Sequence, residues 1–140
     1  MTKTELFVAL AIVFFAKSAF ALQPTELVGR WTVSWPKTET QNSISLSCEK
    51  GRLFGSYVSD EGEACEVAGK LAEKELLLLQ INCSKWNVKL KGNVSSDGGA
   101  ITGFYTYHYQ GADNDLDRFY IPPWSAHGKF AMSKNHETSN

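Results

Sequence analysis

The sequence predicts an all-β protein, an eight-stranded antiparallel up-and-down (meander) barrel. Two observations carry this prediction. Short segments of alternating apolar and polar residues follow one another along most of the chain, and turn residues separate them at short intervals. Closing such a meander removes the exposed edges that an open sheet would leave. Because the connections are short, a barrel is favoured over a sandwich with Greek-key crossovers.

The residues before the predicted barrel are typical of a secretory leader. Lys3 gives a basic start, residues 6–15 are mostly apolar, and Ala19-Phe20-Ala21 resembles a cleavage site. The apolar run is too short for a typical transmembrane helix, and no later run is longer. We therefore expect residues 1–21 to be a signal peptide that is cleaved near Ala21, a secreted or periplasmic mature protein, and no membrane span.

The first strand is expected at residues 30–35, where Trp31, Val33 and Trp35 alternate with polar residues and Pro36 ends the run. The later strands share this period of two, with turns such as Glu49-Lys50-Gly51 between them. They are expected at residues 43–48, 52–59, 65–71, 76–83, 86–93, 100–109 and 127–134.

One connection, residues 110–126, is longer than the others and contains Pro122-Pro123. The polar tail, residues 135–140, is expected to be disordered. Residues 22–134 then form a single barrel domain.

The three cysteines all follow the leader, where an oxidising compartment permits disulfides. Folding strands 65–71 and 76–83 about Lys74 places Cys65 opposite Cys83 on the same face. Cys48 lies beside Leu53, at the opposite end of the sheet. The register therefore predicts a Cys65–Cys83 disulfide and a free thiol at Cys48.

Three segments of the chain carry motifs that point to one family of small barrels. Residues 27–32 read LVGRWT, residues 55–59 read GSYVS and residues 128–134 read GKFAMSK. They are similar to the opening L-x-G-x-W-T, the G-x-Y-x-[ST] strand and, in part, the closing G-x-N-x-F-T-[KR] of the avidin/streptavidin family. The members of this family are eight-stranded meander barrels that bind biotin in one mouth. The opening motif alone is shared with lipocalins and other small barrels.

The resemblance implies a ligand site in the barrel mouth. Tyr57 and Ser59 would correspond to hydroxyl donors around the ureido oxygen of biotin. Leu90 would be an apolar wall, Tyr107 an aromatic wall and Trp124 a lid. Trp86 begins a strand and is expected beside the mouth as well. The expected ligand-binding residues are therefore Tyr57, Ser59, Trp86, Leu90, Tyr107 and Trp124.

The sequence departs from the family at two positions that would contact the ligand. Val33 and Phe130 stand where the family has asparagines, so two amide partners for the ureido group are missing. An unpaired buried polar group costs on the order of 1–3 kcal/mol, which predicts much weaker biotin binding. Trp31 is expected to plug the barrel floor, with Lys134 over its indole in a cation–π contact that closes the barrel.

The formal net charge of −1, without a basic run, excludes a typical nucleic-acid-binding protein. His108, His127 and His136 are scattered, so neither a metal site nor a catalytic histidine is indicated, and no cofactor is expected. The acidic loop at residues 113–117 is interpreted as solvated. The predicted protein is not an enzyme.

The expected function is small-ligand binding, with biotin or a biotin-like heterocycle as the ligand. Strand 100–109 carries aromatic residues on both faces, and an outward row with Leu76 and Leu78 would favour a homo-oligomer.

The alternative hypothesis is a periplasmic or secreted protease inhibitor, or another interaction barrel. Such inhibitors also start with an acidic-Leu-x-Gly-x-Trp-Thr segment, here Glu26–Thr32, and insert the preceding residues 22–25 into a target. A lipocalin-like carrier is a third hypothesis, but the C-terminal helix usual in lipocalins has no counterpart in this sequence.

Overall fold

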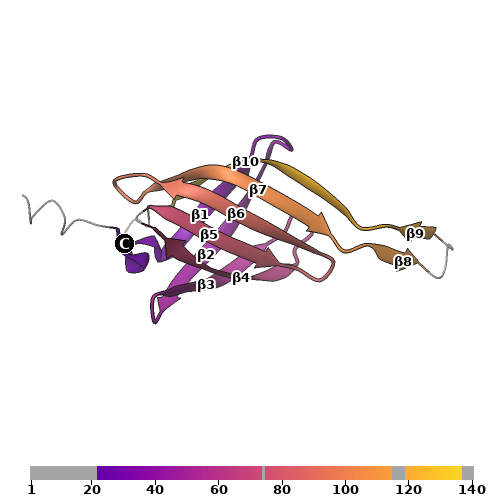
Figure 1. The fold of residues 1–140 in the computed structure, drawn as a ribbon, viewed down its shortest axis with the longest axis horizontal. Helices are drawn as coiled ribbons and strands as arrows, with labels where there is room; N and C mark the ends of the chain where they lie inside the picture. Colours follow the sequence, from indigo (N-terminus) through magenta and orange to yellow (C-terminus); the bar gives the residue numbers. More distant parts are fainter. Residues whose placement is uncertain (1–21, 74, 115–118, 137–140) are drawn as a thin grey trace, which may run out of the picture.

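The protein is a closed antiparallel barrel of eight strands, seen in a computed structural model that describes residues 22–73, 75–114 and 119–136 (Figure 1). The predicted all-β meander barrel is confirmed. The expected signal peptide, residues 1–21, lies outside the described residues. The barrel strands are β1 (Gly29–Trp35), β2 (Thr40–Glu49), β3 (Arg52–Val58), β4 (Ala64–Ala72), β5 (Leu76–Asn82), β6 (Trp86–Val94), β7 (Ala100–Tyr109) and β10 (Trp124–Lys134).

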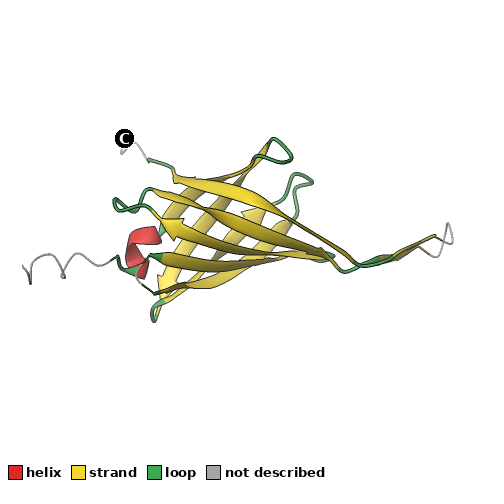
Figure 2. Cartoon of the chain, turned by 45° about the horizontal axis from the view of Figure 1, so that its top comes forward, coloured by secondary structure: helices red, strands yellow, loops and turns green. Residues whose placement is uncertain are grey.

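Strands that are consecutive in the barrel pair with each other, and β10 closes the cylinder by pairing with both β7 and β1. Two short strands, β8 (Ala112–Asn114) and β9 (Phe119–Ile121), form a separate hairpin between β7 and β10. This hairpin extends beyond one end of the barrel (Figures 1 and 2). The expected connection at residues 110–126 therefore contains strand structure, and the last strand begins at Trp124 rather than at residue 127.

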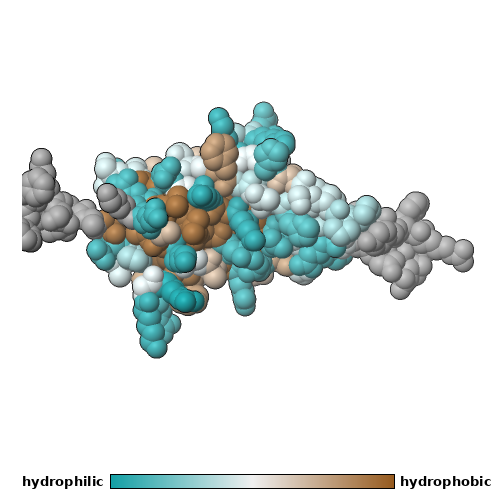
Figure 3. Space-filling view, viewed as in Figure 1, coloured by the Kyte–Doolittle hydropathy of each residue, from teal (hydrophilic) through white to brown (hydrophobic). Residues whose placement is uncertain are grey.

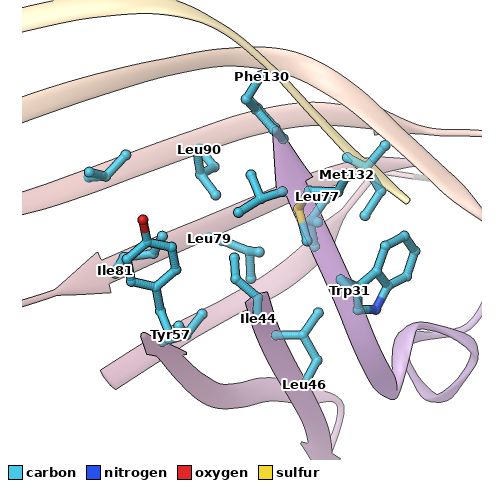
Figure 4. Close-up of a cluster of buried hydrophobic side chains, with 14 of the residues drawn as sticks. Trp31, Ile44, Leu46, Tyr57, Leu77, Leu79, Ile81, Leu90, Phe130 and Met132 are labelled. Carbon is cyan, nitrogen blue, oxygen red and sulfur yellow. The ribbon is translucent and has the colours of Figure 1, made fainter. Parts of the chain in front are cut away.

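The barrel interior is filled by the side chains that alternate inward along each strand. Figure 4 shows part of this core, with Trp31 towards one end and Tyr57 towards the other. Ten of its largest fully buried side chains are Trp31, Leu27, Ile44, Leu53, Leu77, Ile81, Leu90, Ile101, Met132 and Val33. Tyr57 lies at the end where the barrel contains a cavity.

The other end, the floor, is closed by a short 3-10 helix, η1 (Pro24–Leu27), which the sequence pattern did not reveal (Figure 2). Trp31 is fully buried there, and its indole Nε1 donates to the carbonyl oxygen of Leu27 at 2.9 Å. Lys134 pairs with Trp31 across the β1–β10 ladder. Its ammonium donates to the carbonyl oxygen of Glu26 at 2.8 Å. This hydrogen bond differs from the expected cation–π contact, and it satisfies a carbonyl at the end of η1 that has no partner within the helix.

The residues before and after the barrel are attached to it. Leu22 packs against the core, so the start of the segment that the inhibitor hypothesis requires to be free is docked at the floor. Asn135, at the start of the expected tail, donates its backbone N–H to the carbonyl oxygen of Arg30 at 2.8 Å. Residues 137–140 lie outside the described residues. None of the helical structure in the described residues is long and apolar enough to cross a membrane.

The disulfide joins Cys65 on β4 to Cys83 just after β5, and Cys48 is free, as the register predicted. Val67 pairs with Ile81 in the same ladder. The backbone N–H of Cys83 donates to the carbonyl oxygen of Trp86 at 2.9 Å. The disulfide therefore holds the turn that begins β6.

We expect the double variant Cys65→Ala/Cys83→Ala to lose about 3 kcal/mol of unfolding free energy, because the bridge closes a loop across 18 positions and restricts the unfolded chain. Urea denaturation under non-reducing conditions measures this loss. Cys48→Ala is the matched control, and we expect it to cost roughly 1 kcal/mol or less, since this side chain is only partly buried. A double variant as stable as the unsubstituted protein would contradict the structural role of the bridge.

Candidate functional site

The candidate site is a cavity of about 500 Å³ in the barrel mouth, at the end opposite η1. The β1–β2 and β3–β4 connections and the starts of β6 and β10 surround it. Six aromatic side chains dominate the lining, as is usual for small-molecule sites. They are Trp35, Tyr57, Trp86, Tyr105, Tyr107 and Trp124.

Strand alternation explains why these rings converge. Tyr105 and Tyr107 are two residues apart on β7, so both point to the barrel interior. Gly128 lies opposite Tyr105 on β10, and a Cβ at this position would meet the phenol ring at 2.8–2.9 Å. The glycine thus lets the Tyr105 ring lie against the β10 backbone, from where it contacts Trp35 edge-on with ring centroids 5.1 Å apart.

A continuous row of rings also lines the mouth. Tyr57 and Trp86 are perpendicular, with ring centroids 6.0 Å apart, and Trp86 stacks on Tyr107 at 5.5 Å. Tyr107 contacts Trp124 at 5.1 Å. Trp124 begins β10, is 48% exposed and also stacks on Tyr109, with ring centroids 5.8 Å apart. Such a row offers flat apolar faces to a planar ligand.

Tyr57 is buried, and its hydroxyl points away from Leu46 and Trp31 (Figure 4). Burial raises the pKa of Tyr57 to about 12; the indole N–H of Trp35 lowers this pKa to a smaller extent and the Asp60 carboxylate raises it. The phenol is therefore protonated at neutral pH, where its hydroxyl serves as a hydrogen-bond donor.

This pKa predicts an alkaline loss of stability. The folded protein holds the Tyr57 proton more tightly than the unfolded chain, whose tyrosine pKa is near 10, so stability falls as the pH rises from 10 towards 12. We expect this fall to be larger than in Tyr57→Phe by roughly 2 kcal/mol. Denaturation at successive pH values measures it, and identical profiles for the two proteins would show that Tyr57 ionises as freely when folded.

Hydrogen bonds of polar side chains connect β1, β2 and the β3–β4 turn at the rim of the mouth. The indole Nε1 of Trp35 donates to the side-chain oxygen of Asn42 at 2.9 Å. The amide nitrogen of Asn42 in turn donates to the Asp60 carboxylate at 2.8 Å. Ser59 accepts from the backbone N–H of Glu63 at 3.1 Å, which shapes the β3–β4 turn. These bonds fix Trp35 and Asp60 relative to each other.

The structure brings together five of the six residues expected to bind a ligand: Tyr57, Ser59, Trp86, Tyr107 and Trp124 line the same cavity. Leu90 is buried in the core and is not part of this lining.

Other residues of the lining, among them Asn42, Asp60, Glu61 and Tyr105, were not predicted from the sequence. The inward period of β7 was the available signal for Tyr105, whereas Asp60 and Glu61 had the appearance of an ordinary turn.

A metal site is not evident among the described residues. The one group of possible ligands with suitable spacing there is Glu63, Cys65 and Cys83, and the two sulfurs are joined in the disulfide. The Glu63 carboxylate accepts from the backbone N–H of Ser84 at 2.8 Å. Hydrogen bonds from Ser84 are the main cause that lowers the pKa of Glu63. This carboxylate therefore has a structural partner in the next turn.

No protein-family model matches the sequence, and neither does any curated protein. Among solved structures, the crystal structure of rhizavidin is similar, with a TM-score of 0.51 and 13% sequence identity. The similarity covers 80% of this chain and 84% of rhizavidin. The fold is avidin-like. At this identity the comparison establishes the architecture, and the residues of the mouth carry the functional argument.

In this avidin-like barrel, the two positions that depart from the family's motifs are part of the packed interior. Val33 is fully buried and Phe130 nearly so. Phe130 also contacts Trp35, with ring centroids 6.4 Å apart. Apolar packing beneath the mouth thus occupies the places where the resemblance would put amide side chains.

The outer wall of the barrel does not carry the row of aromatic residues that was expected for self-association. Tyr105 and Tyr107 face the interior, and Phe104 is the outward aromatic residue of β7, 64% exposed. Figure 3 shows apolar side chains gathered on the wall of β4–β7, with hydrophilic side chains around them. A groove of about 730 Å³ crosses this wall over Ala68 and Leu78. The cations along it are Arg52, Lys70, Lys89 and Lys91.

Proposed function

We propose that this protein is an exported, non-enzymatic barrel that binds one small ligand in its mouth. The cavity lined by six aromatic rings is the observation that carries the proposal. Biotin or a biotin-like heterocycle is the first ligand class to test, since the fold is avidin-like and the sequence resembles that family in the Tyr57–Ser59 segment.

The geometry suits a planar ligand that enters edge-first. Its ring would lie against the row formed by Trp86, Tyr107 and Trp124, where apolar contact gains roughly 25 cal/mol per Å² removed from water. The protonated Tyr57 hydroxyl would donate to a carbonyl oxygen of the ligand, and the Ser59 hydroxyl is within the same lining. Without the two amide partners, we expect affinity for biotin far below that of the tightest family members.

The lining also favours binding over catalysis. It contains neither histidine nor cysteine among the described residues. Burial, followed by smaller contributions from Tyr109 and Glu61, raises the pKa of Tyr107, so neither phenol in the row is a ready base at neutral pH.

Calorimetry and thermal shift with biotin and biotin amide test the proposal. We expect binding heat and a raised melting temperature for at least one of them, both reduced in Tyr57→Phe, which keeps the ring and removes the donor. Absence of heat and of any thermal shift with both compounds would exclude the biotin-like ligand class.

Export is part of the proposal, because the disulfide requires an oxidising compartment and the leader pattern precedes the barrel. Expression in a bacterial host, followed by N-terminal sequencing of the periplasmic and medium fractions, tests it. We expect the mature chain to start at Leu22. Accumulation in the cytosol with an uncleaved start at Met1 would contradict export.

Self-association through the outer groove is a further part of the proposal. Apolar contact between two copies would bury Phe104 and Leu78, but a two-fold interface would also bring the groove cations of both copies together. Salt screens such repulsion, so we expect the dimer fraction in sedimentation velocity to rise with salt and to fall in Phe104→Ser. A species that is monomeric at all salt concentrations, or a dimer that Phe104→Ser leaves intact, would show that this wall does not self-associate.

A further inference from the structure

Two carboxylates stand on the rim of the mouth. Asp60 and Glu61 lie in the β3–β4 turn, and both are among the residues that line the cavity. The Asn42 amide holds Asp60 in place at 2.8 Å, and the same Asn42 accepts from Trp35. The position of the Asp60 carboxylate over the mouth is thus tied to the aromatic lining itself.

Neither carboxylate is neutralised by an ion pair within the described residues. Lys37 is the one cation among the lining residues, and it belongs to the β1–β2 connection. Its ammonium donates to the carbonyl oxygen of His127 on β10 at 3.4 Å. The charges of the rim are therefore separated: two carboxylates on the β3–β4 side and one engaged ammonium on the β1–β10 side.

The field of these carboxylates reaches the rings. Burial is the main cause that raises the pKa values of Tyr57 and Tyr107, and Asp60 adds to this for Tyr57 and Glu61 for Tyr107. The faces of the neighbouring indole and phenol rings carry partial negative charge as well. Burial disfavours charge of either sign, whereas the two carboxylates and the ring faces favour positive charge inside the mouth.

We infer that the mouth selects ligands that carry a positive charge, an amine or a quaternary ammonium group, in addition to a ring. This inference rests on the proposed function and specifies its ligand. The ring would lie along Trp86 and Tyr107, and the cation would be placed between the aromatic faces and the carboxylates of Asp60 and Glu61. An anionic tail on the same ring is repelled by those carboxylates.

Two sets of matched probes test the charge preference by calorimetry. The first keeps one ring system and varies the tail: biotin (anionic), biotin amide (neutral) and the amine formed from biotin and ethylenediamine (cationic). The second compares phenyltrimethylammonium with tert-butylbenzene, its neutral isostere. We expect each cation to bind at least tenfold more tightly than its anionic or neutral counterpart, with a preference that decreases as salt is added.

The double variant Asp60→Asn/Glu61→Gln should bring the affinities within each set to within about threefold, because it removes both charges and keeps the shape of the rim. Glu66→Gln is the matched control, since this exposed carboxylate lies on β4 outside the cavity lining, and it should leave the preference unchanged. Circular dichroism confirms that each variant keeps the barrel.

The outcomes separate the two proposals. Binding with equal affinities in each set, a preference for the anionic tail, or a cation preference that survives in Asp60→Asn/Glu61→Gln would overturn the inference and leave ligand binding in the mouth intact. Failure of all five probes to bind would overturn both the charge preference and the proposed ligand class.

Discussion

Trp31→Ala should destabilise the protein by about 3–5 kcal/mol, which is the usual cost of emptying the space of a buried tryptophan. Trp31 is fully buried at the barrel floor. It packs beneath η1 and donates to the carbonyl oxygen of Leu27, so the substitution also removes a buried hydrogen bond. Much of the stability of a domain of this size would be lost.

Urea denaturation followed by circular dichroism measures the effect. If Trp31→Ala does not fold, Trp31→Phe provides the comparison: it keeps an aromatic ring, removes the N–H donor and leaves a smaller cavity. We expect Trp31→Phe to fold with an intermediate loss of roughly 1–3 kcal/mol. A Trp31→Ala variant within about 1 kcal/mol of the unsubstituted protein would mean that the floor is not a packed part of the core.

Trp86→Ala should weaken ligand binding more than any other single substitution of an aromatic residue in the mouth. Trp86 contacts both Tyr57 and Tyr107, so its removal interrupts the row in the middle. A ring stacked on a planar ligand contributes roughly 1–3 kcal/mol, which predicts about a tenfold to hundredfold loss of affinity for biotin amide.

Trp124→Ala is the comparison for this prediction. Trp124 is half exposed, so we expect its removal to cost less than tenfold in affinity. Calorimetry with both variants ranks the two positions. If Trp124→Ala costs more than Trp86→Ala, the ligand binds outside the rim and not in the interior of the mouth.

Local alternation was sufficient to predict the barrel, its register and the disulfide. A strand with one buried face has only one register that keeps its apolar side chains inside. The pairing of Val67 with Ile81 and the bridge from Cys65 to Cys83 follow from that constraint. The meander topology followed because short connections leave few alternatives.

The features that the sequence did not reveal depend on contacts between distant segments. η1 is short, and it is held at the floor by Lys134 from the other end of the chain. The β8–β9 hairpin continues the β7–β10 pair beyond the barrel, and its short strands show no clear alternation.

Depth within the barrel was equally difficult to predict. Alternation shows that Leu90 and Tyr57 point inward, but it does not show which of them is close to the open end. The structure places Leu90 in the packed core and Tyr57 at the cavity. Asp60 and Glu61 could not be predicted as lining residues for a similar reason. A turn between two strands becomes part of the rim only when the barrel closes around it.

The central claim is that a small ligand binds in the mouth of the barrel. A two-dimensional NMR titration with biotin amide that follows the indole N–H resonances tests this claim most directly. The chain has four tryptophans: Trp35, Trp86 and Trp124 line the mouth, and Trp31 lies sealed at the floor as an internal reference. We predict that saturating probe shifts the three mouth signals and leaves that of Trp31 in place. Mouth signals that stay unmoved while binding heat is present, or a shift confined to Trp31, would contradict it.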